Sequence, residues 1–484
     1  MDESDQNVVC NDRMKWNIET SELIEQIRSN DPNFVGVVNC TSQQNLDDLG
    51  EALENNTVLT KLVMCYDFSD GLDMWRFAKG LEINKTLQKL NLNHCTVGSE
   101  QLEYLTRALM NNNTLRELII ADNKIFGHGA KHIAEMLKVN KGLRMLFMSE
   151  NPLCNEGIEY LHEGLRKNLS LEELFVNNCC IGSRGAIFIS IVLFLHNTLK
   201  TLEISDNPLG PQGGEYLAKG LFLNSGLTKL DLSGCDLRAK GIGLLSQALE
   251  KNKSLTWLDL SENRLGDYVD DQEEGMKQLV QMLENNKTLL TLNLSDNNMG
   301  EEIKLLSKAL EVNRSLVSID LSNNRLDVYS MARFCQMLKI NNTLKYLGLS
   351  GCYIQSYEAR QLFEAMMFNT SVTELEISDN NIGCDGVSYL VKMLKRNNSL
   401  RSLNIYGNGL YDYPFILLCD CLKSNNNLLK VNVGYNEISP EGVAYFEETM
   451  GGKLNSMTVD LFPLKPVPFQ DCDKTNEDCD EFDM

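Results

Sequence analysis

LTWLDLSEN, residues 255–263, contains the pattern that decides the fold: leucine at the first, fourth and sixth positions and asparagine at the ninth. The same pattern recurs along the chain, most often at a spacing of 28 residues. Other copies are LRELIIADN (115–123), LKTLEISDN (199–207), LLTLNLSDN (289–297), LVSIDLSNN (316–324) and VTELEISDN (372–380). A fixed period of this length predicts an array of similar units stacked on one another, without a single central core.

The first half of each unit predicts a short strand. Alternating leucines point to one face of a strand and the residues between them point to the other. Asparagine at the ninth position can satisfy loop backbone groups that are buried within the stack. Cysteines occupy this position in four units, which predicts buried structural thiols at Cys95, Cys179, Cys235 and Cys352. Fourteen units begin at Leu59, Leu87, Leu115, Leu143, Leu171, Leu199, Leu227, Leu255, Leu289, Leu316, Leu344, Val372, Leu400 and Leu428.

The second half of each unit predicts an amphipathic helix. GIEYLHEGLRKN (157–168) and GIGLLSQALEKN (241–252) place apolar residues at helical spacing. Strands then form one parallel sheet with helices outside it. Strands pack about 4.8 Å apart and helices about 8–10 Å apart, so the stack should curve with the sheet inside. The expected fold class is an α/β solenoid, shaped as a horseshoe with an inner parallel sheet and outer helices.

The ends of the array depart from the pattern. We expect an N-terminal arm and capping helix in residues 1–30, one degenerate and fourteen regular repeats in 31–453, a C-terminal capping strand in 454–466, and a disordered acidic tail in 467–484. One unit runs 34 residues, from Leu255 to Thr288, and its extra segment is acidic. A solvated loop is the simpler interpretation of that segment, and a binding role stays open.

The repeat text also resembles a known class. The 28-residue pattern, with predicted helical segments such as LGPQGGEYLAKGL (209–221), is similar to the ribonuclease-inhibitor-like class of leucine-rich repeats over residues 31–461. The resemblance implies the horseshoe fold. It does not assign a function, because the class includes enzyme inhibitors, sensor arms of innate immune receptors, a GTPase-activating protein of nuclear transport, actin-capping proteins and axonemal subunits. We do not expect a full immune receptor of that type, because no nucleotide-binding domain accompanies the repeats in this sequence.

Charge and composition restrict the partners and the compartment. The formal net charge is −22, which argues against nucleic acid and anionic membranes as partners. The start MDESDQNVVC lacks the features of a signal peptide, so we expect a cytoplasmic protein with reduced cysteines. Asn-x-Ser/Thr triplets such as Asn84-Lys85-Thr86 are then expected to be polar turns and not glycosylation sites.

No catalytic constellation is evident in the sequence. Phosphate-binding loops are absent, and His128 and His132 are the one histidine pair with metal-like spacing, which we interpret as a surface pair. Cys179-Cys180 and Cys419-Asp420-Cys421 lack redox or zinc spacing and are expected to be core thiols. We expect neither a cofactor nor a metal site, and no enzymatic activity.

The residues between the leucines supply the candidate binding surface. An apolar stripe is predicted at Ile119, Met145, Phe147 and Phe175, where the fold itself requires no apolar residue. An acidic stripe follows, flanked by two aromatic residues as possible anchors; it comprises Glu203, Asp231, Asp259, Asp320 and Glu376, with Trp257 and Tyr346. Alternatively, the acidic residues merely solvate this face and the apolar ones cover one another across neighbouring strands.

The preferred hypothesis is a monomeric cytoplasmic scaffold that binds a protein partner with a basic surface on the concave face. One alternative is a GTPase activator of the nuclear-transport type, suggested by repeats followed by an acidic tail. Another is a structural subunit of a ciliary or cytoskeletal assembly, which no sequence feature supports or excludes.

Overall fold

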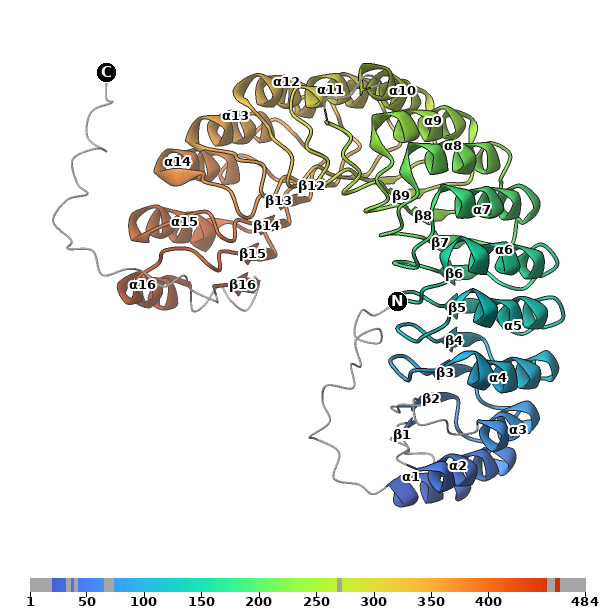
Figure 1. Cartoon of the computed structure of the whole chain (residues 1–484). Coiled ribbons are helices and arrows are strands. Elements are labelled where there is room, and N and C mark those ends of the chain that lie inside the picture. The colour runs from blue at the N-terminus through green and yellow to red at the C-terminus, as the bar shows by residue number, and fades with distance from the viewer. Residues whose placement is uncertain are drawn as a thin grey trace, which may run out of the picture. The chain divides into compact units, whose positions relative to one another are not determined.

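The computed structural model describes residues 20–31, 36–38, 42–64, 74–267, 272–450 and 458–461. Over these ranges the chain alternates short strands with helices, one pair to each repeat (Figure 1). The expected arm before residue 20, Asp270 and Asp271 of the acidic insertion, and the acidic tail lie outside the described residues.

The strands are three residues long in most repeats. They are β1 Val37–Val38, β2 Lys61–Met64, β3 Lys89–Asn91, β4 Glu117–Ile119, β5 Met145–Phe147, β6 Glu173–Phe175, β7 Thr201–Glu203, β8 Lys229–Asp231, β9 Trp257–Asp259, β10 Thr291–Asn293, β11 Ser318–Asp320, β12 Tyr346–Gly348, β13 Glu374–Glu376, β14 Ser402–Asn404, β15 Lys430–Asn432 and β16 Thr458–Asp460.

The helices alternate with the strands, beginning with α1 before β1. They are α1 Thr20–Arg28, α2 Gln43–Asn55, α3 Trp75–Ile83, α4 Ser99–Asn111, α5 Gly127–Leu137, α6 Cys154–Leu165, α7 Ser183–Leu195, α8 Gly210–Leu221, α9 Arg238–Lys251, α10 Gln272–Asn285, α11 Glu302–Val312, α12 Val328–Leu338, α13 Ser356–Met366, α14 Gly383–Leu394, α15 Asp412–Ser424 and α16 Pro440–Met450.

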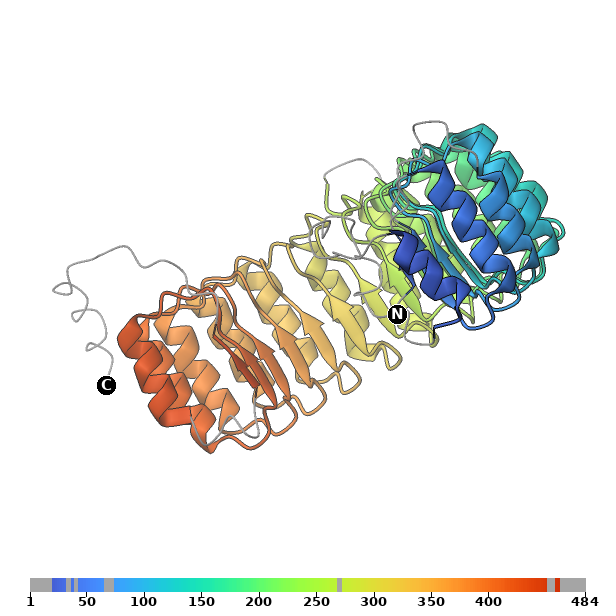
Figure 2. The same ribbon diagram turned by 90° about the horizontal axis from the view of Figure 1, so that it is seen from below.

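The chain forms two compact units, Met1–Leu292 (unit 1) and Asn293–Met484 (unit 2). In both, neighbouring strands are parallel and paired one repeat apart, as in Leu118↔Leu146 of unit 1 and Leu347↔Leu375 of unit 2. Helices cover one face of the strands in each unit (Figure 2). This confirms the predicted α/β solenoid of parallel strands and a helical layer. Because the register step equals the repeat, residues at the same repeat position form rows across the strands.

The core consists of the repeated leucines. Leu115, Leu118 and Ile120 illustrate the first, fourth and sixth positions of one unit, and each is 0% exposed. The side chains between them lie on the opposite face of the strands, which we call the open face. The short elements described near the ends are α1, β1 and β16, and β16 pairs with β15 through Val431↔Val459.

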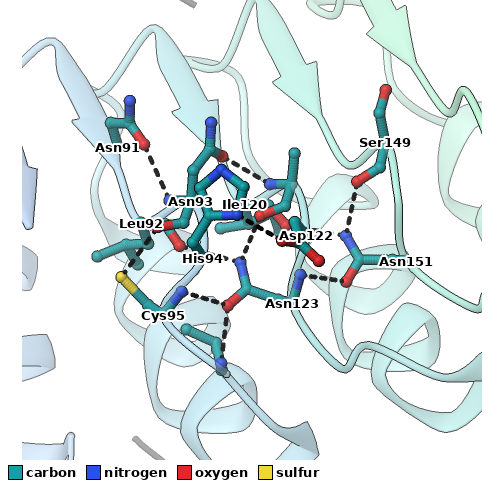
Figure 3. A network of polar contacts seen from close by, with 12 residues as sticks. Asn91, Leu92, Asn93, His94, Cys95, Ile120, Asp122, Asn123, Ser149 and Asn151 are labelled. Carbon is teal, nitrogen blue, oxygen red and sulfur yellow. Dashed lines mark hydrogen bonds and ion pairs between the residues drawn. The ribbon is translucent and has the colours of Figure 1, made fainter. Parts of the chain in front are cut away.

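Asparagine at the ninth position links each repeat to the one before it. The Nδ2 group of Asn123 donates to the carbonyl of Leu92 at 2.9 Å, and its Oδ1 accepts from the backbone N–H groups of Cys95 (3.1 Å) and Val97 (2.8 Å) (Figure 3). The side chain thus satisfies three backbone groups of the preceding repeat.

The cysteines at this position confirm the predicted structural role. Cys95 donates its thiol to the carbonyl of Met64 at 3.2 Å, in the geometry that asparagine uses elsewhere. Burial raises the pKa of the thiols of Cys179, Cys235 and Cys352 to about 12, so they remain protonated and unreactive at neutral pH.

The remaining cysteines that were expected to be core thiols differ in their burial. Cys419 and Cys421 are buried, as predicted. The prediction is wrong for Cys180, which is exposed. Its backbone φ is 58°, and this left-handed turn directly after the buried ninth position directs the next side chain outward.

A second row of asparagines performs a role that the sequence did not reveal. The Nδ2 group of Asn252 donates to the carbonyls of Leu221 (3.0 Å) and Asn224 (2.9 Å), and its Oδ1 accepts from the N–H groups of Ser254 and Leu255 (2.9 Å each). The side chain is 3% exposed. In nine of the Asn-x-Ser/Thr triplets the asparagine is therefore not part of a solvated polar turn, because its side chain is buried, whereas Asn55 of another triplet is exposed.

This row, which we call the turn ladder, is interrupted once among the repeats that the structure describes. His196 occupies the position and is 1% exposed; its Nδ1 accepts from the N–H of Leu199 at 3.2 Å. Burial lowers the pKa of this imidazole, which keeps it neutral. The other members are Asn56, Asn84, Asn112, Asn140, Asn168, Asn224, Asn252, Asn286, Asn313, Asn341, Asn369, Asn397 and Asn425.

Candidate functional site

The predicted binding residues all lie at the third or fifth position of a repeat, on the open face of the strands. Those of unit 1 come from β4 to β9, and those of unit 2 from β11 to β13 (Figure 1). In unit 1 the fifth positions form a row through the registers Ile119↔Phe147, Phe147↔Phe175 and Phe175↔Glu203. The row continues with Asp231 and Asp259.

The apolar stripe is much less exposed than the sequence predicted. Ile119, Met145 and Phe175 are 8%, 6% and 1% exposed, and among the four residues Phe147 alone is partly open to solvent. Phe147 stacks on Phe175 with ring centroids 4.9 Å apart. The alternative interpretation, in which these side chains cover one another across neighbouring strands, therefore describes three of them.

The aspartates of the fifth row have a local structural task. Oδ1 of Asp231 accepts from the N–H (2.9 Å) and the hydroxyl (2.7 Å) of Ser233, and Oδ1 of Asp259 accepts from Ser261 in the same way. Asn293 makes the same backbone contact in the next repeat, to Ser295 N–H at 3.0 Å. This contact is the short turn with which Asp and Asn side chains close a strand, so part of the acidic stripe has a cause within the fold.

A lysine that the sequence reasoning missed neutralises part of the stripe. Lys229 pairs with Glu203 at 2.8 Å, and its ammonium lies 4.5 Å from the centroid of the Trp257 ring. The face of Trp257 is thus already occupied by a cation, which reduces its value as an anchor for a partner. Lys229 sits at the third position between Thr201 and Trp257, and the register alone could have indicated it.

Two carboxylates of this face are costly to keep charged. Burial raises the pKa of Asp231 to about 6, with a further contribution from the neighbouring charges of Asp259 and Glu203. Burial also raises the pKa of Glu173, and the charges of Glu117 and Glu172 act in the same direction. A cation beside these carboxylates would relieve this cost.

Unit 2 carries a separate acidic group on its open face. Tyr346 donates its hydroxyl to Oδ2 of Asp320 at 3.4 Å, and burial together with the charges of Asp320 and Glu376 raises the pKa of the phenol. Gly348 lies between the two acidic residues in the fifth row, and a Cβ there would lie 2.3 Å from Oδ1 of Asp320. The glycine therefore leaves the space that the Asp320 side chain uses.

Other candidates do not assemble into a site. His128 is a surface residue, with 83% of its side chain exposed and its Nδ1 3.6 Å from the carboxylate of Glu156. No group of three or more His, Cys, Asp or Glu side chains in the described ranges could hold a metal ion. Within the same ranges, none of the helices has the length and apolar character needed to cross a membrane.

Comparison with protein-family models identifies leucine-rich repeats in this chain. The matched segments are residues 84–105, 111–134, 167–190, 196–218, 224–246, 251–267, 285–303, 368–391 and 424–446. The match shows the type of repeat, whereas the ribonuclease-inhibitor-like subtype stays a prediction.

Two further comparisons add less. No curated protein matches the chain in sequence. Among solved structures, an internalin (inlF) from Listeria monocytogenes strain 4b F2365 is similar at 16% sequence identity, over 92% of this chain and 95% of the internalin chain, with a TM-score of 0.42. A likeness at this level carries no information on function.

Proposed function

We propose that this chain of leucine-rich repeats is a cytoplasmic scaffold that binds a protein partner on the open face of unit 1. One observation carries the proposal: the fifth row changes from apolar to acidic between Phe175 and Glu203, although aspartate or asparagine closes the strand in other repeats. Phe147 and Phe175 do nothing for that turn. An aromatic pair in place of a turn-forming residue therefore favours a role outside the fold.

The chemistry of the face indicates the kind of partner. Phe147 offers a partly exposed ring, Glu173 lies on the strand of Phe175, and Asp231 and Asp259 follow two and three strands further along the fifth row. Raised pKa values at Glu173 and Asp231 mean that a partner cation would gain from entering this surface. We expect a protein segment with an apolar side chain next to lysine or arginine, and an affinity that falls as salt is added.

The cysteines support the proposed compartment. The ten cysteines that the structure describes are free thiols, and four of them occupy buried positions where asparagine serves in other repeats. A chain that uses protonated thiols as structural hydrogen-bond donors suits a reducing environment.

The test uses substitutions that the repeat already tolerates at the fifth position. The variant Phe147→Asn/Asp231→Asn/Asp259→Asn removes the ring and two charges while keeping an amide oxygen for each turn. The control Glu103→Gln/Glu135→Gln/Val139→Asn makes matched changes on α4, on α5 and at Val139 just after α5, which is 52% exposed. Each full-length protein is used as bait in cell extract, and the recovered proteins are quantified by mass spectrometry.

Partners that the unaltered chain and the control retain, and that the open-face variant loses at least tenfold, support the proposal. Equal recovery by all three baits would show that binding occurs elsewhere. Asp320, Tyr346 and Glu376 form a second candidate contact on unit 2, which Tyr346→Ser with Glu376→Gln tests separately in the same assay.

A further inference from the structure

Helix α7 breaks the pattern of the helical layer. Ile191, on its outer side, is 37% exposed. The fifth residue before the turn ladder is Ile191 in this repeat, and every other repeat carries a polar residue there: Glu51, Lys79, Arg107, Glu135, Glu163, Lys219, Gln247, Gln281, Lys308, Gln336, Glu364, Lys392 and Asp420. The solenoid therefore does not require an apolar side chain at this position.

The ends of α7 and α8 show the same departure. Phe194 and Phe222 are 53% and 51% exposed, two residues before the turn ladder. Ten other repeats carry a charged residue there, namely Glu54, Glu82, Lys138, Arg166, Glu250, Glu284, Glu311, Lys339, Lys395 and Lys423, and the remaining two carry Met110 and Met367. Leu195 and Leu223 follow directly and are 51% and 60% exposed. Because α7 and α8 are neighbours in the helical layer (Figure 1), the five side chains form one surface, which we call the outer patch.

The outer patch has the size of a functional contact. Its five side chains leave roughly 500 Å² of apolar surface in water, near the upper end for the largest patch on a monomeric protein. A standard interface takes about 800 Å² from each partner, so the patch and the polar side chains around it would suffice for one. An isolated chain gains nothing from keeping Ile191, Phe194 and Phe222 in water at positions where most of its other repeats place polar or charged side chains.

Charge around the patch selects the occupant. The chain carries a net charge of −22, yet the segments 154–167, 183–195 and 210–223 contain four acidic and four basic residues. Three of the cations already pair within this surface: Arg166 with Glu163, Arg184 with Glu159, and Lys219 with Glu215. A neutral surface attracts neither a basic partner nor an anionic membrane, and it is where two copies of an acidic chain repel each other least.

We propose that the outer patch is the contact through which two copies of this chain associate. In a two-fold dimer the same patch serves both copies, and α7 of one copy would pack against α7 of the other along the stripe Ile191, Phe194 and Leu195. This inference departs from the monomer expected from sequence. It is independent of the proposed function, because the outer patch lies on the helical layer and the binding face on the strands.

The test measures the mass of the full-length protein in solution. The variant Ile191→Gln/Phe194→Lys/Phe222→Glu installs residues of the kinds found in other repeats and leaves the net charge unchanged. The control Ile340→Gln/Phe368→Glu removes exposed apolar side chains, 53% and 63% exposed, from helix ends of unit 2. Light scattering after size exclusion is recorded over a hundredfold range of protein concentration, and circular dichroism checks that each variant is folded.

We expect a mass about twice the 54.7 kDa of one chain for the unaltered protein and the control, and at least a tenfold weaker dimer for the outer-patch variant. If that variant does not fold, Ile191→Gln alone replaces it. A single-chain mass for the unaltered protein at every concentration, or a dimer that the variant does not weaken, overturns the proposal. Flotation with neutral phosphatidylcholine vesicles, lost in the variant while the protein stays monomeric, would overturn it in favour of a lipid surface.

Discussion

Replacing Asp231 with asparagine is expected to stabilise the chain at neutral pH. The strand-closing turn needs an oxygen at this position, and Asn404 and Asn432 supply it from an amide in other repeats. Asparagine keeps that acceptor and removes the Asp231 carboxyl group, whose pKa is raised from 3.8 to about 6 in the folded chain. Two pKa units correspond to at most about 3 kcal/mol, and screening by water at this half-buried side chain reduces the expected gain to about 1–2 kcal/mol.

The pH dependence gives this prediction its sign. The folded state holds the Asp231 proton to a higher pH than the unfolded chain does, so the unaltered protein loses stability as the pH rises from about 4 to about 6. The advantage of Asp231→Asn should therefore be complete above about pH 7 and shrink towards zero near pH 4.

The measurement is urea unfolding followed by circular dichroism at several pH values. Asp231→Ala is the control, because it removes the charge but leaves the two Ser233 donors without their acceptor. We expect its free energy of unfolding to be about 1–2 kcal/mol lower than that of the unaltered chain. If Asp231→Asn is no more stable than the unaltered chain at neutral pH, or if its advantage does not change with pH, the charge of Asp231 carries no folding cost and the reasoning fails.

Two predictions concern the turn ladder. Asn252→Ala should reduce the free energy of unfolding by about 3–5 kcal/mol, because two buried carbonyls and two N–H groups lose their partner; a loss under about 1 kcal/mol in urea unfolding would contradict the role assigned to the ladder. His196→Asn should raise the melting temperature, and more so below about pH 6, because the lowered pKa of buried His196 makes the unaltered chain lose stability as the pH falls. Equal melting temperatures for the two proteins at acidic pH would refute this.

The repeat period made the fold predictable, because leucine recurs at the same buried positions from one repeat to the next. The role of Asn252 was missed, although the ladder has the same period, because a polar residue beside serine suggests a solvated turn until the carbonyls 28 and 31 residues earlier are seen. The open face was predicted only in part. Strand alternation assigns Phe175 to a face, but its 1% exposure depends on the sizes of its neighbours, which no period encodes.

Local comparison between repeats would have found more. Ile191 and Phe194 are visible in the sequence as apolar residues at positions where most other repeats are polar or charged, whereas strand alternation alone contains no information on the helices. Lys229 is likewise a third-position residue, and its pairing with Glu203 follows from one register step.

Both asparagine rows point backwards along the chain. Asn123 bonds to backbone groups 26 to 31 residues before it, and Asn252 donates to carbonyls 28 and 31 residues before it. Each repeat therefore supplies side-chain hydrogen-bond partners to backbone groups of the repeat before it. Its own backbone groups receive their partners from the repeat that follows. On the ribosome the predecessor is always made first, so every emerging repeat meets a neighbour whose backbone groups still lack these partners, and the order of synthesis matches the order of closure. The unfinished end of the growing array is always the newest one, which makes the last repeat the one with most need of a cap.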